Sequence, residues 1–240
     1  MSEKKVMNRN FVVFGAIVIQ LCLGAIYAWS VFVPSLKDAG WTNTQTQAVF
    51  SAGLALFAIV MVIAGRLMSK FGPKKIAMSG GVVLGLGYLL AGLFGGTNFW
   101  LIFIFVGIIG GSGIGLAYVV PIAVGMRWFP DKKGLITGLA VAGFGFGATL
   151  WVKLAGTWGS LIENLGLSTT FTIYGIVFFV AVFLGSLTMI FPPEGWKPKG
   201  WEPTVTEKKA ATGNQMKSGE MLRSPQYYMI LLTFVFFIDA

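Results

Sequence analysis

The sequence lacks histidine altogether, has a single cysteine and contains few charged residues. The absence of histidine excludes histidine-based catalysis, proton relay and metal ligation, and the lone Cys22 excludes a disulfide within the chain. The sequence also has no G-x-x-x-x-G-K-[ST] phosphate-binding loop and no metal-ligand spacing. These absences disfavour an ATP-driven pump, and we predict a chain that is not an enzyme and carries no cofactor.

Hydrophobic residues dominate the composition instead. They make up 55% of the 240 residues, and the mean hydropathy is +0.77. Only 11% of the residues are charged, against about a quarter in a typical soluble domain. This composition predicts an all-α integral membrane protein. The net charge of +9 comes from basic residues in short segments between apolar runs, so membrane orientation explains it better than a nucleic-acid partner does.

Six apolar runs are long enough to cross a bilayer, which needs roughly 20 apolar residues. A seventh run begins near Tyr227 and reaches only Ala240, so its length of about 21 Å falls short of a hydrocarbon core about 30 Å thick. We expect a six-helix transmembrane bundle over 1–191, a cytoplasmic linker over 192–224 and the start of a seventh helix over 225–240, as in the front part of a longer protein. The six runs are 11–36, 44–68, 76–95, 99–126, 134–157 and 169–191.

Basic residues are distributed unevenly between the two sides of these predicted spans. Sixteen of the 18 Lys and Arg residues fall in the N-terminal segment, the second and fourth connections and the linker, whereas only Lys37 and Lys153 fall on the other side. Loops rich in Lys and Arg stay on the cytoplasmic side of a membrane. The pattern predicts a multi-pass protein of the cytoplasmic (inner) membrane with its N-terminus in the cytoplasm.

The connection between the second and third runs, residues 65–75, reads Gly-Arg-Leu-Met-Ser-Lys-Phe-Gly-Pro-Lys-Lys. Gly65, Gly72 and Pro73 permit a tight turn. The segment resembles the loop between helices 2 and 3 of major facilitator superfamily transporters, whose pattern is roughly G-x-L-x-D-R-x-G-R/P-R/K-R/K. A generic basic loop is the alternative. Ser69 stands where the family has an acid, so the charge network that this acid supports must be weaker or built differently here.

Three further strings narrow the resemblance. Trp-Phe-Pro-Asp-Lys-Lys-Gly at 128–134, Tyr-Ala-Trp-Ser at 27–30 and Ala-Gly-Phe-Gly-Phe-Gly at 142–147 are similar to strings of the oxalate/formate antiporter family, which includes bacterial lactate transporters. The resemblance implies the major facilitator fold, with this chain as an N-terminal six-helix bundle of two inverted three-helix repeats and a C-terminal six-helix half as its partner. The implied cytoplasmic loops, which gate and orient such carriers, contain Gly65, Lys70, Gly72, Lys74, Asp131 and Lys132.

Tyr118 is the sharpest candidate for substrate binding. It lies nine residues before Arg127, hence about 13 Å inside the membrane, near the depth at which transporter substrates bind. Its hydroxyl needs a partner, either on a neighbouring helix or on a substrate carboxylate. The resemblance implies a tyrosine that faces the central cavity at this position, and it implies that Tyr27, Leu54 and Phe144 shape the same pocket.

Departures from the family pattern favour one class of substrate. Phe144 stands where the oxalate carrier has a tyrosine, and Ile26 and Leu54 replace two of its glutamines. Oxalate carries two carboxylates, and each needs partners when it is buried. An apolar wall therefore favours lactate, pyruvate, acetate or propionate. The middle of the six runs contains no charged residue, and the family places its anion-binding arginine and lysine in helices 8 and 11, beyond Ala240.

A few residues inside the runs have competing interpretations. Asp239, the only acid inside a run, is a candidate for proton coupling, although it could instead pair with a residue outside this sequence or face a water-filled cavity. Gln20, seven residues before Tyr27 and thus on the same helix face, is expected to hydrogen bond another helix. Small residues let membrane helices pack closely, and we expect this of Gly107, Gly111, Gly115, Gly134, Gly138, Gly143 and Gly147.

Together these observations favour a secondary active transporter of small monocarboxylates such as lactate, coupled to a proton and working by alternating access. Its expected partners are a small carboxylate anion, a proton, the lipid bilayer and the C-terminal half. Three alternatives stay open: an oxalate/formate-type anion antiporter, a non-transporting membrane sensor or assembly partner with the carrier fold, and a six-helix half-carrier that acts as a homodimer.

Overall fold

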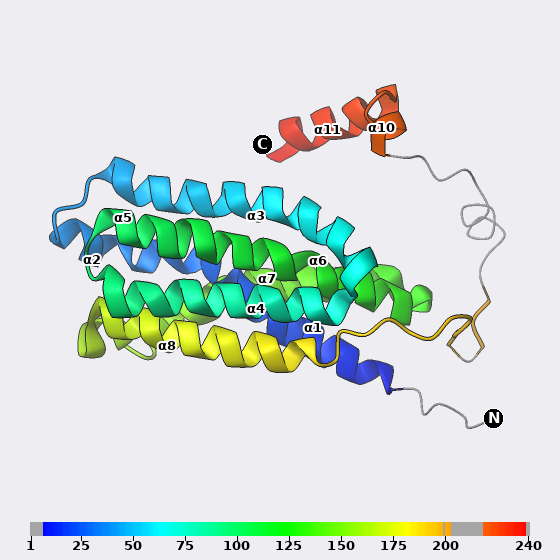
Figure 1. Ribbon diagram of the computed structural model, residues 1–240, viewed down its shortest axis with the longest axis horizontal. Helices are drawn as coiled ribbons and strands as arrows, with labels where there is room; N and C mark the ends of the chain where they lie inside the picture. Colours follow the sequence, from blue (N-terminus) through cyan, green and yellow to red (C-terminus); the bar gives the residue numbers. More distant parts are fainter. Residues whose placement is uncertain (1–6, 199, 203–217, 239–240) are drawn as a thin grey trace. The chain divides into compact units, whose positions relative to one another are not determined.

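The computed structural model is helical wherever it has regular structure in the residues that it describes, which are 7–198, 200–202 and 218–238 (Figure 1). The chain divides into two compact units, Met1–Pro198 and Lys199–Ala240. Six helices of the first unit are long and apolar enough to cross a membrane. The prediction of six membrane-spanning segments is therefore confirmed.

The six spans of the first unit lie side by side along their lengths (Figure 1). The first span contains a 3-10 stretch, and the third and fourth contain π-helical stretches. In chain order the elements are α1 (Arg9–Leu23), η1 (Gly24–Val31) and α2 (Val33–Asp38); α3 (Asn43–Phe71); α4 (Pro73–Leu90) and η2 (Ala91–Gly95); α5 (Phe99–Ile102), η3 (Phe103–Gly110) and α6 (Gly111–Trp128); η4 (Pro130–Lys132) and α7 (Lys133–Ala155); and α8 (Leu161–Ser186).

The second unit contains two helices among its described residues. The short α10 spans Ser218–Met221, and the apolar α11 spans Pro225–Ile238. The candidate proton-coupling residue Asp239 lies just outside the described residues.

Local sequence explains where several spans begin and end. Thr42 and Gln45 form a reciprocal capping box at the start of α3, which satisfies backbone N–H groups that the first helical turn cannot pair. Between α3 and α4, Gly72 adopts φ +83°, a conformation that favours glycine, and Pro73 then occupies the first turn of α4. This turn is tight, as the sequence predicted, so α3 and α4 are antiparallel neighbours.

Several boundaries differ from the sequence prediction. The second span continues to Phe71, so Gly65 lies inside α3 and takes no part in the turn. The prediction that Gly65 shapes the turn was wrong because this glycine lies within the apolar run itself, and the turn begins only at Gly72. The sixth span begins at Leu161 rather than at residue 169, with a break at Gly166, where φ is +78°.

The contacts between spans follow a repeating pattern. When each span is replaced by the span three places before or after it in the chain, a pair of spans in contact becomes another pair in contact. The first span packs on the fifth (α1 on α7), and correspondingly the fourth packs on the second (α6 on α3). The third packs on the fourth (α4 on α6), and the sixth packs on the first (α8 on α1). This pattern is what two inverted three-helix repeats produce.

Glycines allow the closest of these approaches. A methyl group at Gly111 would lie 2.5 Å from the carbonyl oxygen of Gly53, and one at Gly24 would collide with the carbonyl of Phe144. The predicted packing role is confirmed for the glycines with close neighbours and is wrong for Gly134 and Gly138, where a methyl group would meet nothing within 4 Å in this unit. The confirmed positions are Gly107, Gly111, Gly115, Gly143 and Gly147.

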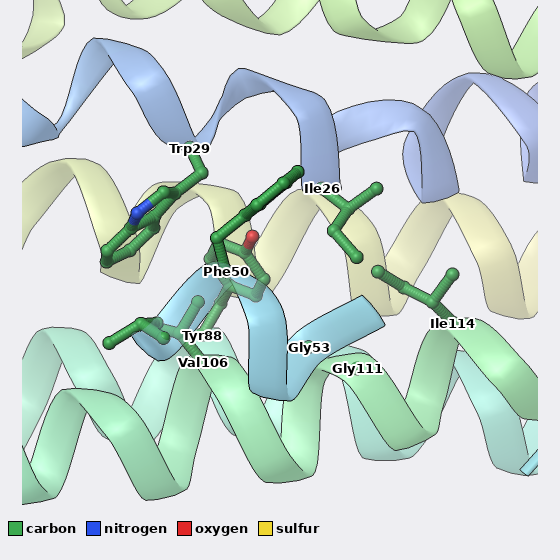
Figure 2. A pocket seen from close by; sticks show the side chains of 9 residues that line it. Ile26, Trp29, Phe50, Gly53, Tyr88, Val106, Gly111 and Ile114 are labelled. Atoms are coloured by element: carbon green, nitrogen blue, oxygen red, sulfur yellow. The ribbon is translucent and has the colours of Figure 1, made fainter. Parts of the chain in front are cut away.

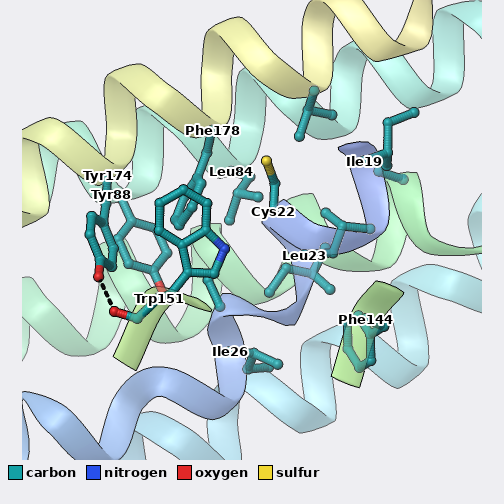
Figure 3. Close-up of a cluster of buried hydrophobic side chains, with 14 of the residues drawn as sticks. Ile19, Cys22, Leu23, Ile26, Leu84, Tyr88, Phe144, Trp151, Tyr174 and Phe178 are labelled. Atoms are coloured by element: carbon teal, nitrogen blue, oxygen red, sulfur yellow. Dashed lines mark hydrogen bonds between the residues drawn. The ribbon is translucent and has the colours of Figure 1, made fainter. Parts of the chain in front are cut away.

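A buried aromatic core joins α7 and α8 to the first and third spans (Figure 3). Trp151 donates from its indole Nε1 to the carbonyl of Leu21 at 2.7 Å, and the Tyr174 hydroxyl donates to the carbonyl of Trp151. The ring of Phe178 packs edge-on against Trp151, with ring centres 4.8 Å apart. Because these polar atoms are paired, Trp151 and Tyr174 can be buried without the cost of an unsatisfied donor.

Candidate functional site

Five aromatic rings from four spans meet in the first unit, and we call them the aromatic cluster. Phe144 on α7 is its centre: its ring lies 4.9 Å from that of Tyr118 on α6 and 5.5 Å from that of Tyr27 on η1. Phe57 on α3 lies 5.0 Å from Tyr118 in an edge-to-face arrangement, and Phe50 lies 6.4 Å from Tyr27. The cluster thus ties together three of the four residues that the sequence assigned to a substrate site.

The fourth of these residues, Leu54, belongs to the same helix face. It lies four residues after Phe50 and three before Phe57, so the three side chains point the same way from α3. Leu54 is half-buried and packs against the hydrophobic core. Leu54 thus adds an aliphatic side chain to the face of α3 that carries Phe50 and Phe57.

One side of the cluster is open. Phe144 is 7% exposed, whereas Tyr27 is 46% exposed, and Tyr118 is intermediate. A groove of about 160 Å³ adjoins Tyr27 and Phe50, and Ser30 and Gln47 add polar groups to its lining. A small molecule can therefore reach the ring of Tyr27 without any rearrangement of the unit.

The two tyrosine hydroxyls have no hydrogen-bond partner among the described residues. Tyr118 and Tyr27 contact other residues through their rings only. The alternative in which a neighbouring helix accepts from Tyr118 is therefore not realised in this conformation. Phenolic O–H groups can donate to an anionic oxygen, so the cluster offers two donors beside apolar ring faces.

A second cavity nearby is too small for any carboxylate. It holds about 10 Å³, room for about one water molecule. Figure 2 shows Ile26, Trp29 and Tyr88 around it. Ile26 is 6% exposed and faces Gly53 across the helix interface, so its expected place in the open apolar wall is wrong. Between Gly24 and Val31 the chain follows a 3-10 path, which places Ile26 inside and Tyr27 outside.

Gln20 lies behind the cluster. It is fully buried, and its Nε2 donates to the backbone carbonyl of Tyr118 at 3.5 Å, which confirms the predicted hydrogen bond to another helix. The α-helix gives way to η1 between Gln20 and Tyr27, and the two residues differ in exposure, with Gln20 at 0% and Tyr27 at 46%. Sequence reasoning also missed Phe50 and Phe57, although their spacing around Leu54 would have placed them on one face.

The predicted loop residues gather at the end of the unit where α3, α6 and α8 end, which we call the basic end (Figure 1). Asp131 accepts from Arg9, with 3.0 Å between the carboxylate oxygen and the guanidinium nitrogen. The guanidinium carbon of Arg9 lies 4.5 Å from the ring centre of Phe129. The ion pair and the ring contact join the start of α1 to the turn η4. Lys132, in the same turn, is exposed.

The segment that follows α8 packs on the end of α6, also at the basic end. Trp128 donates from Nε1 to the carbonyl of Ile190 at 2.6 Å, and Trp196 packs edge-to-face on it with ring centres 4.8 Å apart. Arg127 stacks over Phe191 at 3.8 Å. Trp196 is thus a packing partner of Trp128.

In the turn between α3 and α4, unlike at Arg9 and Asp131, the polar side chains at the end of α3 make contacts within their own helix. The Ser69 hydroxyl donates to the carbonyl of Arg66 at 2.7 Å, a bond within its own helix. The ammonium of Lys70 lies 5.4 Å from the ring centre of Phe71. Gly72 supplies the turn, and Lys74 is half-buried in the first turn of α4. Ser69 therefore does not replace the acid of the family pattern as a partner for the basic residues. In the described part of the chain, no three His, Cys, Asp or Glu side chains gather as a metal site would require.

Comparison with known proteins relates the chain to membrane transporters. The sequence is 31% identical over 233 residues to the "Uncharacterized MFS-type transporter YhjX" of Escherichia coli K12, covering 95% of this chain and 54% of that protein. It is 26% identical over 229 residues to the oxalate:formate antiporter of Oxalobacter formigenes, covering 95% of this chain and 51% of that protein. It is 28% identical over 182 residues to the apicoplast pyruvate carrier 1 of Toxoplasma gondii, covering 59% and 33%.

The chain spans about half the length of the first two of these relatives. Residues 12–239 match the family model of the Major Facilitator Superfamily, which is nearly the whole chain. The six apolar spans, with contacts that repeat between the two sets of three, agree with one half of that fold. This chain therefore belongs to the Major Facilitator Superfamily, and its six apolar spans are those of a multi-pass membrane protein.

Proposed function

We propose that this chain is the N-terminal half of a secondary carrier that moves a small monocarboxylate, of the lactate or pyruvate kind, across the cytoplasmic membrane together with a proton. The observation that carries the proposal is the aromatic cluster. It combines two phenolic donors, Tyr27 and Tyr118, with apolar surface from Phe144 and Leu54. One carboxylate and one short hydrocarbon end match that combination.

The chemistry of binding follows from the environment of the cluster. A carboxylate that leaves water needs donors, and hydrogen bonds to a charged group are the stronger ones. Tyr118 and Tyr27 would donate to the carboxylate oxygens, while Phe144 would contact the hydrocarbon end. The spans described here have no charged side chain at this depth. The proposed C-terminal half would supply the cation that neutralises the anion.

Two relatives support a carboxylate substrate. The names of the Oxalobacter formigenes and Toxoplasma gondii proteins give oxalate, formate and pyruvate as their substrates, and all three are small carboxylates. Transfer of this substrate class to the present chain is part of the proposal. The apolar side chain of Leu54 favours one carboxylate over two, whereas Ile26 is buried at the helix interface and does not contribute to this preference.

The proposed orientation places the N-terminus and the basic end in the cytoplasm, because sixteen of the 18 Lys and Arg residues lie in the segments on that side. Residues 192–224 would contain the linker between the halves, and 225–240 the start of the seventh helix. Gly65, Lys70, Gly72, Lys74, Asp131 and Lys132 would lie in the cytoplasmic gating region. Asp239 stays a candidate for proton coupling.

The test is uptake of labelled L-lactate into vesicles that contain the complete gene product, with and without an inward proton gradient. We expect uptake that rises with the gradient and falls when an uncoupler is added. Empty vesicles provide the control. Absence of gradient-driven uptake of lactate, pyruvate, acetate and propionate would refute the proposal.

Oxalate/formate exchange is the second candidate, favoured by the similarity to the antiporter of Oxalobacter formigenes. It predicts counterflow: labelled oxalate would accumulate in vesicles preloaded with unlabelled formate or oxalate. The monocarboxylate proposal predicts no such accumulation, because Phe144 lacks the hydroxyl that a second carboxylate would need.

A further inference from the structure

Gln20 is the one buried side chain in the described residues whose polar atom is left without a partner. Its Oε1 has no hydrogen bond, and the residue is 0% exposed. A buried acceptor without a donor destabilises a fold, because the atom has lost its hydrogen bonds to water. An apolar residue of the same size would avoid this cost, so the amide needs an explanation other than packing.

The other end of the same amide supplies that explanation. Its Nε2 donates to the backbone carbonyl of Tyr118 at 3.5 Å. Three residues further along α6, Pro121 stands inside the helix, and proline has no N–H to give to the carbonyl four residues before it, which is that of Ala117, the residue that precedes Tyr118. The backbone around Tyr118 is therefore held less firmly by its own helix than an uninterrupted helix would hold it.

The position of Gln20 suits a role behind Tyr118. A methyl group on Gly143 of α7 would lie 3.3 Å from the Gln20 Cβ, so α1 and α7 approach closely at this point. The next residue on α7 is Phe144, whose ring packs on that of Tyr118. The Tyr118 ring is thus fixed from one side by Phe144, and its backbone is fixed from behind by Gln20.

We propose that Gln20 is a positioning residue of the substrate site: its amide nitrogen holds the backbone of Tyr118 so that the hydroxyl faces the substrate, and its unpaired oxygen is the stability cost of that role. This inference rests on the proposed function. The proposal differs in its consequences from a role in which Gln20 only joins two helices. In that second case, substitution of Gln20 would lower the stability of the fold and leave the affinity for substrate unchanged.

The test substitutes Gln20 in the complete gene product with leucine and, as a flexible second variant, methionine. Both Gln20→Leu and Gln20→Met remove the unpaired oxygen, so the Tm of the purified carrier should equal or exceed that of wild type. The KM for the transported acid should rise roughly threefold to tenfold, as expected for one modest hydrogen bond, with the maximal rate per folded carrier unchanged. Ser186→Ala is the control, because Ser186 is equally buried but its hydroxyl already donates to the carbonyl of Val182.

A double-mutant cycle with Tyr118→Phe completes the test. If Gln20 acts through the Tyr118 hydroxyl, Gln20→Leu should change KM much less in the Tyr118→Phe background than in wild type. An unchanged KM in both Gln20 variants, a lowered Tm in both, or full additivity in the cycle would overturn the assignment. Wild-type uptake, measured in the same vesicles with each monocarboxylate, tests the proposed function separately. The Gln20 variants are then compared on whichever acid wild type carries.

Discussion

Two groups of aromatic residues in the first unit contain the same types of side chain in different environments. In the buried core, Tyr174 is 1% exposed and its hydroxyl donates to the Trp151 carbonyl. In the aromatic cluster, Tyr118 is partly exposed, and its hydroxyl has no partner among the described residues. The difference teaches that a buried phenol with a hydrogen-bond partner, as in Tyr174, stabilises the helices, whereas the partly exposed and unpaired hydroxyl of Tyr118 is available to donate to a ligand.

Among the substitutions that test this comparison, Trp151→Ala in the buried core should cause the largest loss of stability. The indole is almost fully buried, packs on Tyr174 and Phe178, and donates to the carbonyl of Leu21. We expect about 3–5 kcal/mol of lost stability, as for other buried Trp→Ala changes. The Tm of the purified carrier and its yield in the membrane measure the loss. A yield and Tm equal to wild type would show that the core does not hold the spans together.

Tyr118→Phe should have the next largest effect, on the cluster side. The change removes only the hydroxyl, so the ring packing against Phe144 and Phe57 is retained. Loss of a hydrogen bond to a charged carboxylate weakens binding by about 1.5–3 kcal/mol, or at least roughly tenfold in KM. The Tm should not change. Wild-type kinetics in Tyr118→Phe would remove the hydroxyl from the account.

Tyr174→Phe is the matched change in the core, with the opposite expected pattern. It leaves the buried carbonyl of Trp151 without the donor that Tyr174 provides, and we expect about 1–2 kcal/mol of lost stability. The KM measured per folded carrier should stay at the wild-type value. A raised KM with an unchanged Tm would place Tyr174 in the binding site.

The smallest effect should come from the ion pair at the basic end. Arg9 and Asp131 are 31% and 18% exposed, and partly exposed pairs of this kind contribute about 1 kcal/mol or less. Arg9→Gln, Asp131→Asn and the double variant form a cycle measured by Tm at low and high salt. We expect a coupling that shrinks as salt is added. A coupling that is large and independent of salt would show a more tightly held contact.

Sequence reasoning located the six spans because long apolar runs set them. The candidate site rested on the distance of Tyr118 from Arg127 and on the family resemblance, and the structure brings the rings of Tyr118, Tyr27 and Phe144 together.

Sequence reasoning failed at Ile26 and Gly65. Ile26 points inward because η1 is a 3-10 helix, and Gly65, although a glycine, lies inside the apolar run that forms α3. The spacing of Phe57 from Leu54 places both on one face of α3, but its contacts with Tyr118 on α6 and Phe144 on α7 depend on how the helices pack, which local sequence does not show.

The most direct test of the comparison is the KM for L-lactate of Tyr118→Phe and Tyr174→Phe, measured side by side in vesicles with equal amounts of folded carrier. The two variants lose the same atom from the same residue type. The account predicts a KM raised about tenfold or more in Tyr118→Phe and unchanged in Tyr174→Phe. Equal KM values in the two variants would contradict it.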